Sequence, residues 1–160
     1  MQQNTLGRFN MNFKTILFAT DFSEGSKNAL PYAVDLAKRY GAKLYFMHIV
    51  YDVARTTGWY VPHISVEEMY NDLEKGARTE LEKTFTEEMR GLKGIEHVVM
   101  KGIPYEEITK FAETNKIDLI VLATHGRTGL DRLLFGSTAE QVVRYAPCPV
   151  LSVRLPKHQE

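Results

Sequence analysis

The chain contains apolar runs that do not alternate with polar residues. Residues 14–20 read Lys-Thr-Ile-Leu-Phe-Ala-Thr, and residues 118–124 read Asp-Leu-Ile-Val-Leu-Ala-Thr. Strands with apolar side chains on both faces are typical of parallel sheets that helices cover on both sides. The full set of predicted strands is 14–20, 43–50, 96–101, 118–124 and 150–154.

Apolar residues at helical spacing predict a helix between each pair of successive strands. The first helix has Ser23 as a suitable N-cap and Gly41 as a suitable C-cap. The second starts with the capping-box spacing of Ser65 and Glu68, and its apolar stripe predicts one long helix. The predicted helices run from Ser23 to Tyr40, from Ser65 to Met89, from Pro104 through Ala112, and from Thr138 to Tyr145.

This alternation of strands and helices predicts a single-domain α/β fold of the Rossmann-like kind. Right-handed crossovers make the sheet parallel and place helices on both of its faces. We expect five strands in the order 3-2-1-4-5, with a switch point between the first and fourth strands. The domain spans residues 11–155, with a flexible leader at 1–10 and a tail at 156–160.

The charge of the chain excludes some classes of partner. Twenty basic and twenty acidic residues give a net charge of zero, so no electrostatic footprint for nucleic acid or an anionic membrane is expected. No apolar run approaches the roughly 20 residues of a membrane span. The single cysteine, Cys148, excludes an internal disulfide, and we expect a cytoplasmic protein in which this thiol is a small buried residue rather than a redox centre.

Two segments meet at the switch point and predict a binding site there. Thr20 and Asp21 end the first strand, and residues 123–138, which contain Gly126, Gly129 and Gly136, lead from the fourth strand to a helix. A flexible turn that ends at a helix N-terminus aims backbone N–H groups at phosphate oxygens. We therefore predict a nucleotide-phosphate site in this crevice.

Several site residues have two interpretations. Asp21 would hydrogen-bond a ribose or an adenine edge, or help to hold Mg²⁺, and it would alternatively stabilise the start of the first helix. Ser137 would contact phosphate, and its spacing to Glu140 also fits a capping box; both roles are compatible. His125 lies inside the predicted loop, where we interpret it as a structural residue rather than a general base. The histidines lack metal-ligand spacing, so no metal site made of protein ligands alone is expected.

The chain resembles the universal stress protein family from about Asn12 to Arg154. Three features carry the resemblance: the opening strand with Thr20-Asp21-Phe22-Ser23, the glycine loop, and the closing segment 146–151, Ala-Pro-Cys-Pro-Val-Leu. The ATP-binding branch of that family has a Gly-x2-Gly-x9-Gly-(Ser/Thr) loop. Its last two glycines correspond to Gly126 and Gly136, which is followed by Ser137, whereas Ala123 stands in place of the first. An alanine there still permits a close backbone approach unless the position requires a positive φ.

The resemblance implies an adenine nucleotide α-hydrolase-like fold that binds ATP, ADP or AMP, with Mg²⁺ beside the phosphates. Within the loop we expect Arg127 to add positive charge near the phosphates and His125 to lie beside the nucleotide. The residues that it places around the nucleotide are Ala19, Thr20, Asp21, Ile49, Val50, Leu122, Ala123, Gly126, Gly136, Ser137 and Thr138.

The function implied is that of a small stress-response regulator or sensor. We expect no catalytic residue and at most slow ATP hydrolysis or autophosphorylation, because backbone donors bind charge without supplying a nucleophile or a base. The apolar last strand, Val150–Arg154, predicts a homodimer in which two such strands cover each other. The alternative is a dimerising interaction module whose nucleotide site is vestigial. An adenylate-forming enzyme is disfavoured, because Asp21-Phe-Ser-Glu-Gly25 follows the first strand in place of the signatures such enzymes carry.

Overall fold

The computed structural model describes residues 12–52, 66–84, 89–124 and 137–155. Strands and helices alternate as predicted, and every pair of neighbouring strands is parallel, in the order β3-β2-β1-β4-β5. The expected leader 1–10 and tail 156–160 lie outside the described residues. The elements are β1 (Thr15–Thr20), α1 (Glu24–Tyr40), β2 (Lys43–Tyr51), α3 (Val66–Lys83), β3 (Ile95–Gly102), α4 (Pro104–Thr114), β4 (Leu119–Ala123), α5 (Ser137–Tyr145) and β5 (Val150–Val153).

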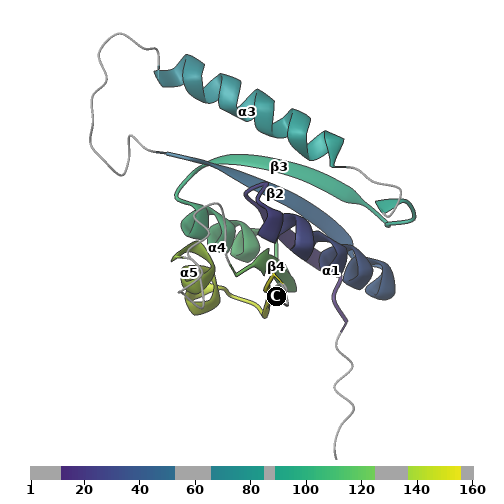
Figure 1. The fold of residues 1–160 in the computed structure, drawn as a ribbon. Helices are drawn as coiled ribbons and strands as arrows, with labels where there is room; N and C mark the ends of the chain where they lie inside the picture. Colours follow the sequence, from purple (N-terminus) through teal and green to yellow (C-terminus); the bar gives the residue numbers. More distant parts are fainter. Residues whose placement is uncertain (1–11, 53–65, 85–88, 125–136, 156–160) are drawn as a thin grey trace, which may run out of the picture.

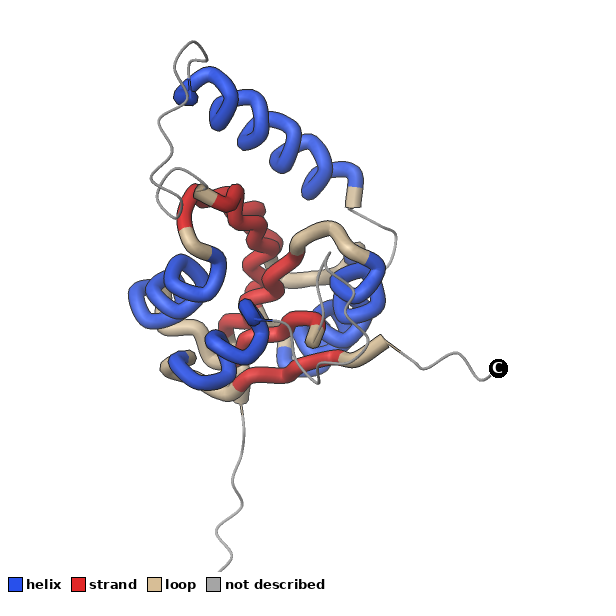
Figure 2. Tube along the Cα trace, turned by 60° about the vertical axis from the view of Figure 1, so that its left-hand side comes forward, coloured by secondary structure: helices blue, strands red, loops and turns tan. Residues whose placement is uncertain are grey.

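Helices cover both faces of the sheet, which confirms the predicted fold class. In Figure 1, α3 lies above strands β3 and β2, and α4 and α5 lie below them. Figure 2 shows the same arrangement from another side, with α3 as the outermost helix. Residues of α1 and α3 join one core cluster, which we call the α1 side, and residues of α4 and α5 join the other, which we call the α4 side.

Strand β1 lies between β2 and β4 and is buried on both faces. Ile16 and Phe18 point to the α1 side, and Leu17 points to the α4 side, because successive side chains of a strand face opposite ways. All three are at most 1% exposed. Burial of one such side chain contributes about 1.5–3 kcal/mol, so this unbroken apolar run explains why β1 takes a central position.

The ends of α1 are those that the sequence predicts. Ser23 is the N-cap, and its hydroxyl accepts a hydrogen bond of 3.2 Å from the backbone N–H of Ser26. Gly41 follows the helix with φ of +60°, and the next N–H, of Ala42, donates to the carbonyl of Ala37 at 2.8 Å. Only glycine adopts this conformation without steric cost.

The prediction of one helix from Ser65 to Met89 is wrong at its C-terminal end. Helix α3 ends at Lys83, and Met89 belongs to a separate short turn. Leu81 and Met89 are both fully buried on the α1 side, so the apolar spacing reports a shared core rather than a continuous helix. The predicted cap at Ser65 lies outside the described residues. In the part of the chain that the structure describes, no helix combines the length and the apolar character needed to cross a membrane.

Candidate functional site

A pocket of about 230 Å³ opens at the carboxyl ends of β1, β2 and β4. It lies where the strand order reverses, the place at which ligands of open α/β sheets bind. Eight of the predicted site residues line it together: Ala19, Thr20, Asp21, Ile49, Leu122, Ala123, Ser137 and Thr138. Val50 does not line this pocket but two neighbouring hollows beneath α3. His125, Gly126, Arg127 and Gly136 lie outside the described residues.

The floor of the pocket is apolar. Met47, Ile108 and Leu122 are buried there as part of the α4 side of the core. Ile49 follows Met47 by two residues on β2, and the period of a strand therefore places both on the same face. A flat apolar group such as a nucleobase fits a surface of this kind.

Six further residues line the pocket without having been predicted from the sequence. Period two along β2 is the signal that points to Met47, given Ile49. No comparable signal exists for Pro104 and Ile108, because only the packing of α4 against the sheet brings them there. The six are Ser26, Met47, Pro104, Ile108, Thr124 and Ala139.

Asp21 performs the structural role that was one of its two predicted interpretations. Its Oδ1 accepts hydrogen bonds from the Ser23 backbone N–H at 3.0 Å, from the Ser23 hydroxyl at 2.5 Å and from the Ser26 hydroxyl at 2.6 Å. These contacts tie the end of β1 to the first turn of α1. Asp21 also lines the pocket, so the same carboxylate is held by the protein and borders the space that a ligand would fill.

The turn after β1 holds Phe22 in a left-handed conformation with φ of +62°. For a residue other than glycine this conformation costs about 1–3 kcal/mol and persists only where the surroundings enforce it. The Phe22 N–H donates to the Thr20 hydroxyl at 3.0 Å, and the Phe22 ring lies 4.4 Å from that of His48. His48 Nδ1 lies 2.9 Å from the Thr20 carbonyl, which can only accept, so Nδ1 carries the proton. The turn that carries Asp21 is therefore fixed from several directions.

Helix α5 comprises Ser137–Tyr145, and the residues immediately before it lie outside the described residues. The capping-box interpretation of Ser137 therefore stays a prediction. The first N–H groups of a helix have no partner within it and carry a partial positive charge. Because Ser137 and Thr138 line the pocket, this end of α5 faces the candidate site.

Two other chemistries find little support in this part of the molecule. Among residues 12–52, 66–84, 89–124 and 137–155, no group of three or more His, Cys, Asp or Glu side chains is placed to hold a metal ion. Cys148 packs against the α4 side of the core but is only partly buried, so the prediction of a fully buried thiol is wrong in degree. Its burial, and secondarily the negative charge of Asp118, raises the pKa of its thiol, and a raised pKa disfavours the reactive thiolate.

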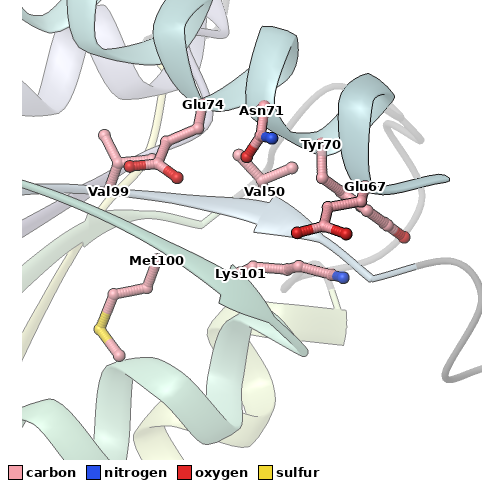
Figure 3. Close-up of a pocket in the computed structure, with 8 residues that line it drawn as sticks. All are labelled: Val50, Glu67, Tyr70, Asn71, Glu74, Val99, Met100 and Lys101. Carbon is pink, nitrogen blue, oxygen red and sulfur yellow. The ribbon is translucent and has the colours of Figure 1, made fainter. Parts of the chain in front are cut away.

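A second hollow of about 510 Å³ lies between α3 and the end of the sheet (Figure 3). Glu67 and Tyr70 reach it from α3 and Lys101 from β3, whereas Met100 points to the opposite face. The Tyr70 hydroxyl donates to Asp52 Oδ1 at 3.0 Å, and Lys101 Nζ lies 3.6 Å from Asp52 Oδ2 and 3.6 Å from the centre of the Tyr70 ring. These contacts join α3 to the ends of β2 and β3.

Comparison with known proteins identifies relatives over nearly the whole chain. The model of the universal stress protein family matches residues 12–154. Universal stress protein MJ0531 of Methanocaldococcus jannaschii is 39% identical over 149 residues, which cover 92% of this chain and 85% of the relative. The solved structure of MJ0577, a universal stress protein of the same organism, has a TM-score of 0.78 at 30% identity and covers 92% of this chain and 99% of that chain.

A more distant structure shares the fold. It is the universal stress protein from Archaeoglobus fulgidus in complex with dAMP, with a TM-score of 0.55 at 21% identity, covering 89% of this chain and 98% of that chain. The chain belongs to the universal stress protein family.

Proposed function

We propose that this protein binds an adenine nucleotide in the pocket at the carboxyl ends of β1, β2 and β4, and that it acts as a dimeric stress-response regulator without efficient turnover. The observation that carries the proposal is the pocket itself, which joins an apolar floor to a polar rim at the switch point of the sheet. We also propose a cytoplasmic location, for which the single cysteine is the support.

In this proposal each part of the nucleotide meets the chemistry that suits it. The base lies against Met47, Ile49 and Ile108, and the ribose lies beside Asp21. The phosphates extend toward the N-terminal end of α5 at Ser137, because the N–H groups and partial positive charge of a helix N-terminus favour negative charge. The loop residues His125, Gly126, Arg127 and Gly136 are proposed to complete the phosphate site.

The ligand is ATP, ADP or AMP. Mg²⁺ would accompany a triphosphate and be held mainly by phosphate oxygens and water, as is usual for this ion. A nucleotide in a protein of the same fold adds support, since the Archaeoglobus fulgidus protein was solved with dAMP. That protein shares only the fold with this chain, so the proposal depends on the pocket.

Calorimetry with ATP, ADP, AMP and adenosine tests the site. Ser137→Asp places a negative charge at the proposed phosphate end, and an acidic residue in the first turn favours the helix itself. We expect this variant to weaken ATP binding about tenfold or more and adenosine binding much less. Val143→Asp is the matched control, because Val143 is exposed on the same helix and does not line the pocket.

Equal losses for ATP and adenosine would place the phosphates elsewhere. If the unaltered protein bound none of these ligands, the alternative of an interaction module with a vestigial site would be favoured.

The proposed dimer uses the open edge of β5. Within the described residues β5 pairs with β4 alone. The carbonyls of Pro149 and Val153 accept hydrogen bonds from the backbone N–H groups of Ile120 in β4 and of Thr124, which follows β4. Alternate residues of a strand point their N–H and C=O groups to opposite sides, so the backbone groups of Ser152 face the open edge. An exposed edge of this kind favours pairing with a second strand, here the Val150–Arg154 strand of a second copy.

Light scattering tests the dimer. Ser152→Pro removes an N–H from the open edge while leaving the ladder to β4 intact, and we expect it to shift the protein toward monomer. Ser152→Ala keeps the N–H and should remain a dimer. A dimer that persists in the proline variant would place the interface on another surface.

A further inference from the structure

Ser26 is buried in the first turn of α1, with 4% of its surface exposed. Its hydroxyl contacts the same residue at two points, since it donates to Asp21 Oδ1 at 2.6 Å and accepts from the Asp21 backbone N–H at 3.3 Å. Ser26 thereby fixes both the main chain and the carboxylate of Asp21.

The position of Ser26 is itself firmly set. The Ser23 hydroxyl caps its N–H at 3.2 Å, and the buried residues Ala29 and Ala33 hold the following turns of α1 against the sheet. Ser23 also binds Asp21, but it belongs to the same turn. Ser26 therefore adds to the contacts of the N-cap Ser23 a buried contact between Asp21 and the helix itself.

Ser26 lies in the first turn of α1, where a serine hydroxyl commonly bonds to nearby backbone groups. Here the hydroxyl is directed to Asp21 instead, and Ser26 lines the same pocket as Asp21. A buried hydrogen bond to a carboxylate that borders a pocket is the arrangement expected where an acceptor must be held ready for a ligand.

We propose that Ser26 is a positioning residue, which holds the Asp21 carboxylate where it accepts hydrogen bonds from the nucleoside part of the ligand. This inference depends on the proposed nucleotide site. Asp21 would contact the ligand directly, and Ser26 would act through Asp21 alone. Without Ser26 the Asp21 carboxylate would keep its two hydrogen bonds from Ser23 but lose the one from the buried Ser26 hydroxyl, so that a nucleotide would bind to a less firmly held carboxylate.

The test is a double-mutant cycle with ATP, measured by calorimetry on the full chain. We expect Asp21→Ala to lower ATP affinity about 10- to 100-fold, the range of a hydrogen bond to a charged group. Ser26→Ala should lower it about 3- to 10-fold in the unaltered background and have no further effect when Asp21 is already alanine, because effects that share one partner do not add.

Val34→Ala is the control for lost stability. Val34 is buried on α1, belongs to the α1 side of the core and does not line the pocket. It should lower the melting temperature at least as much as Ser26→Ala while leaving ATP affinity unchanged. If Ser26→Ala does not fold, Ser26→Cys is used in its place. A thiol is similar in size to a hydroxyl but is a weaker hydrogen-bond donor. We therefore expect the cysteine variant to lose less ATP affinity than is expected for Ser26→Ala.

The outcomes separate the two proposals. Additive losses in the double variant, or equal losses in the Val34 and Ser26 variants, would overturn the role of Ser26 while leaving the nucleotide site in place. If the unaltered protein bound no ATP, the nucleotide site and the role of Ser26 would both be lost.

Discussion

Asp118 joins the amino ends of β1 and β4, and its removal should destabilise the fold without affecting the pocket at the opposite edge of the sheet. Its Oδ2 accepts hydrogen bonds from the backbone N–H of Lys14 at 2.7 Å, from that of Thr15 at 2.9 Å and from the Thr15 hydroxyl at 3.1 Å. These residues are more than 100 positions apart in the chain.

The size of the effect follows from these three bonds. A hydrogen bond to a charged group contributes about 1.5–3 kcal/mol when buried, and partial exposure of this site reduces each bond to roughly 1 kcal/mol. We therefore expect Asp118→Ala to lower the free energy of unfolding at pH 7 by about 2–3 kcal/mol. For a domain of this size the melting temperature should fall by about 5–10 °C.

The same contacts predict a dependence on pH. Burial alone raises the pKa of the Asp118 carboxyl, but the hydrogen bonds from Lys14 and Thr15 and the charge of Lys14 outweigh it, so the pKa lies below its ordinary value of 3.8. A carboxyl whose pKa is lowered by folding stabilises the protein above its unfolded pKa, and this contribution is lost as the pH falls toward the folded value.

Urea unfolding at pH 7, 5, 3.5 and 2.5 measures both effects. Asp118→Asn, which keeps the shape and removes the charge, should be less stable than the unaltered protein at pH 7 and 5, and the difference should shrink below pH 4. ATP affinity serves as the control and should not change. A difference that stays constant from pH 7 to 2.5, or an asparagine variant as stable as the parent at pH 7, would refute the reasoning.

Three further substitutions test the fold. Gly41→Ala should cost about 1–2 kcal/mol in urea unfolding, because alanine is strained at φ of +60° and its Cβ would lie 3.1 Å from Lys93 Nζ; no loss would contradict the cap. Lys116→Gly should instead raise the free energy of unfolding by about 0.5–1 kcal/mol, because φ is +52° at Lys116 and glycine adopts this conformation without strain. A lower free energy of unfolding in this variant would contradict the predicted strain. Tyr70→Phe should cost about 1 kcal/mol through its bond to Asp52 and speed hydrogen exchange in α3; unchanged exchange would show that the bond does not hold the helix.

Sequence patterns predicted the structure correctly where each pattern lies within one strand or helix. The unbroken apolar run of β1 indicated burial on both faces, and Gly41 indicated the end of α1, because both patterns depend on backbone geometry that neighbouring residues set. The end of α3 was mispredicted because Met89 keeps the apolar spacing of the helix while lying in a separate turn. Apolar spacing records which residues reach the core, and a helix followed by a turn can present the same spacing.

The residues of the pocket were predictable from the sequence where they lie at the ends of strands. Thr20, Asp21 and Ser137 follow from the rule that parallel strands bring their carboxyl ends to one edge. Pro104 and Ile108 reach the pocket only because α4 packs beneath that edge, which no spacing along the chain encodes.

Strand order and helix placement could be read from the linear pattern, because hydrophobic period and the hand of the crossovers leave few arrangements for this succession of elements. The hydrogen bonds that Ser26 makes to Asp21, and that Asp118 makes to Lys14 and Thr15, could not. Such bonds require donor and acceptor to meet within about 3 Å, and that distance is set by how helices and strands pack in three dimensions rather than by the identity of the residues alone.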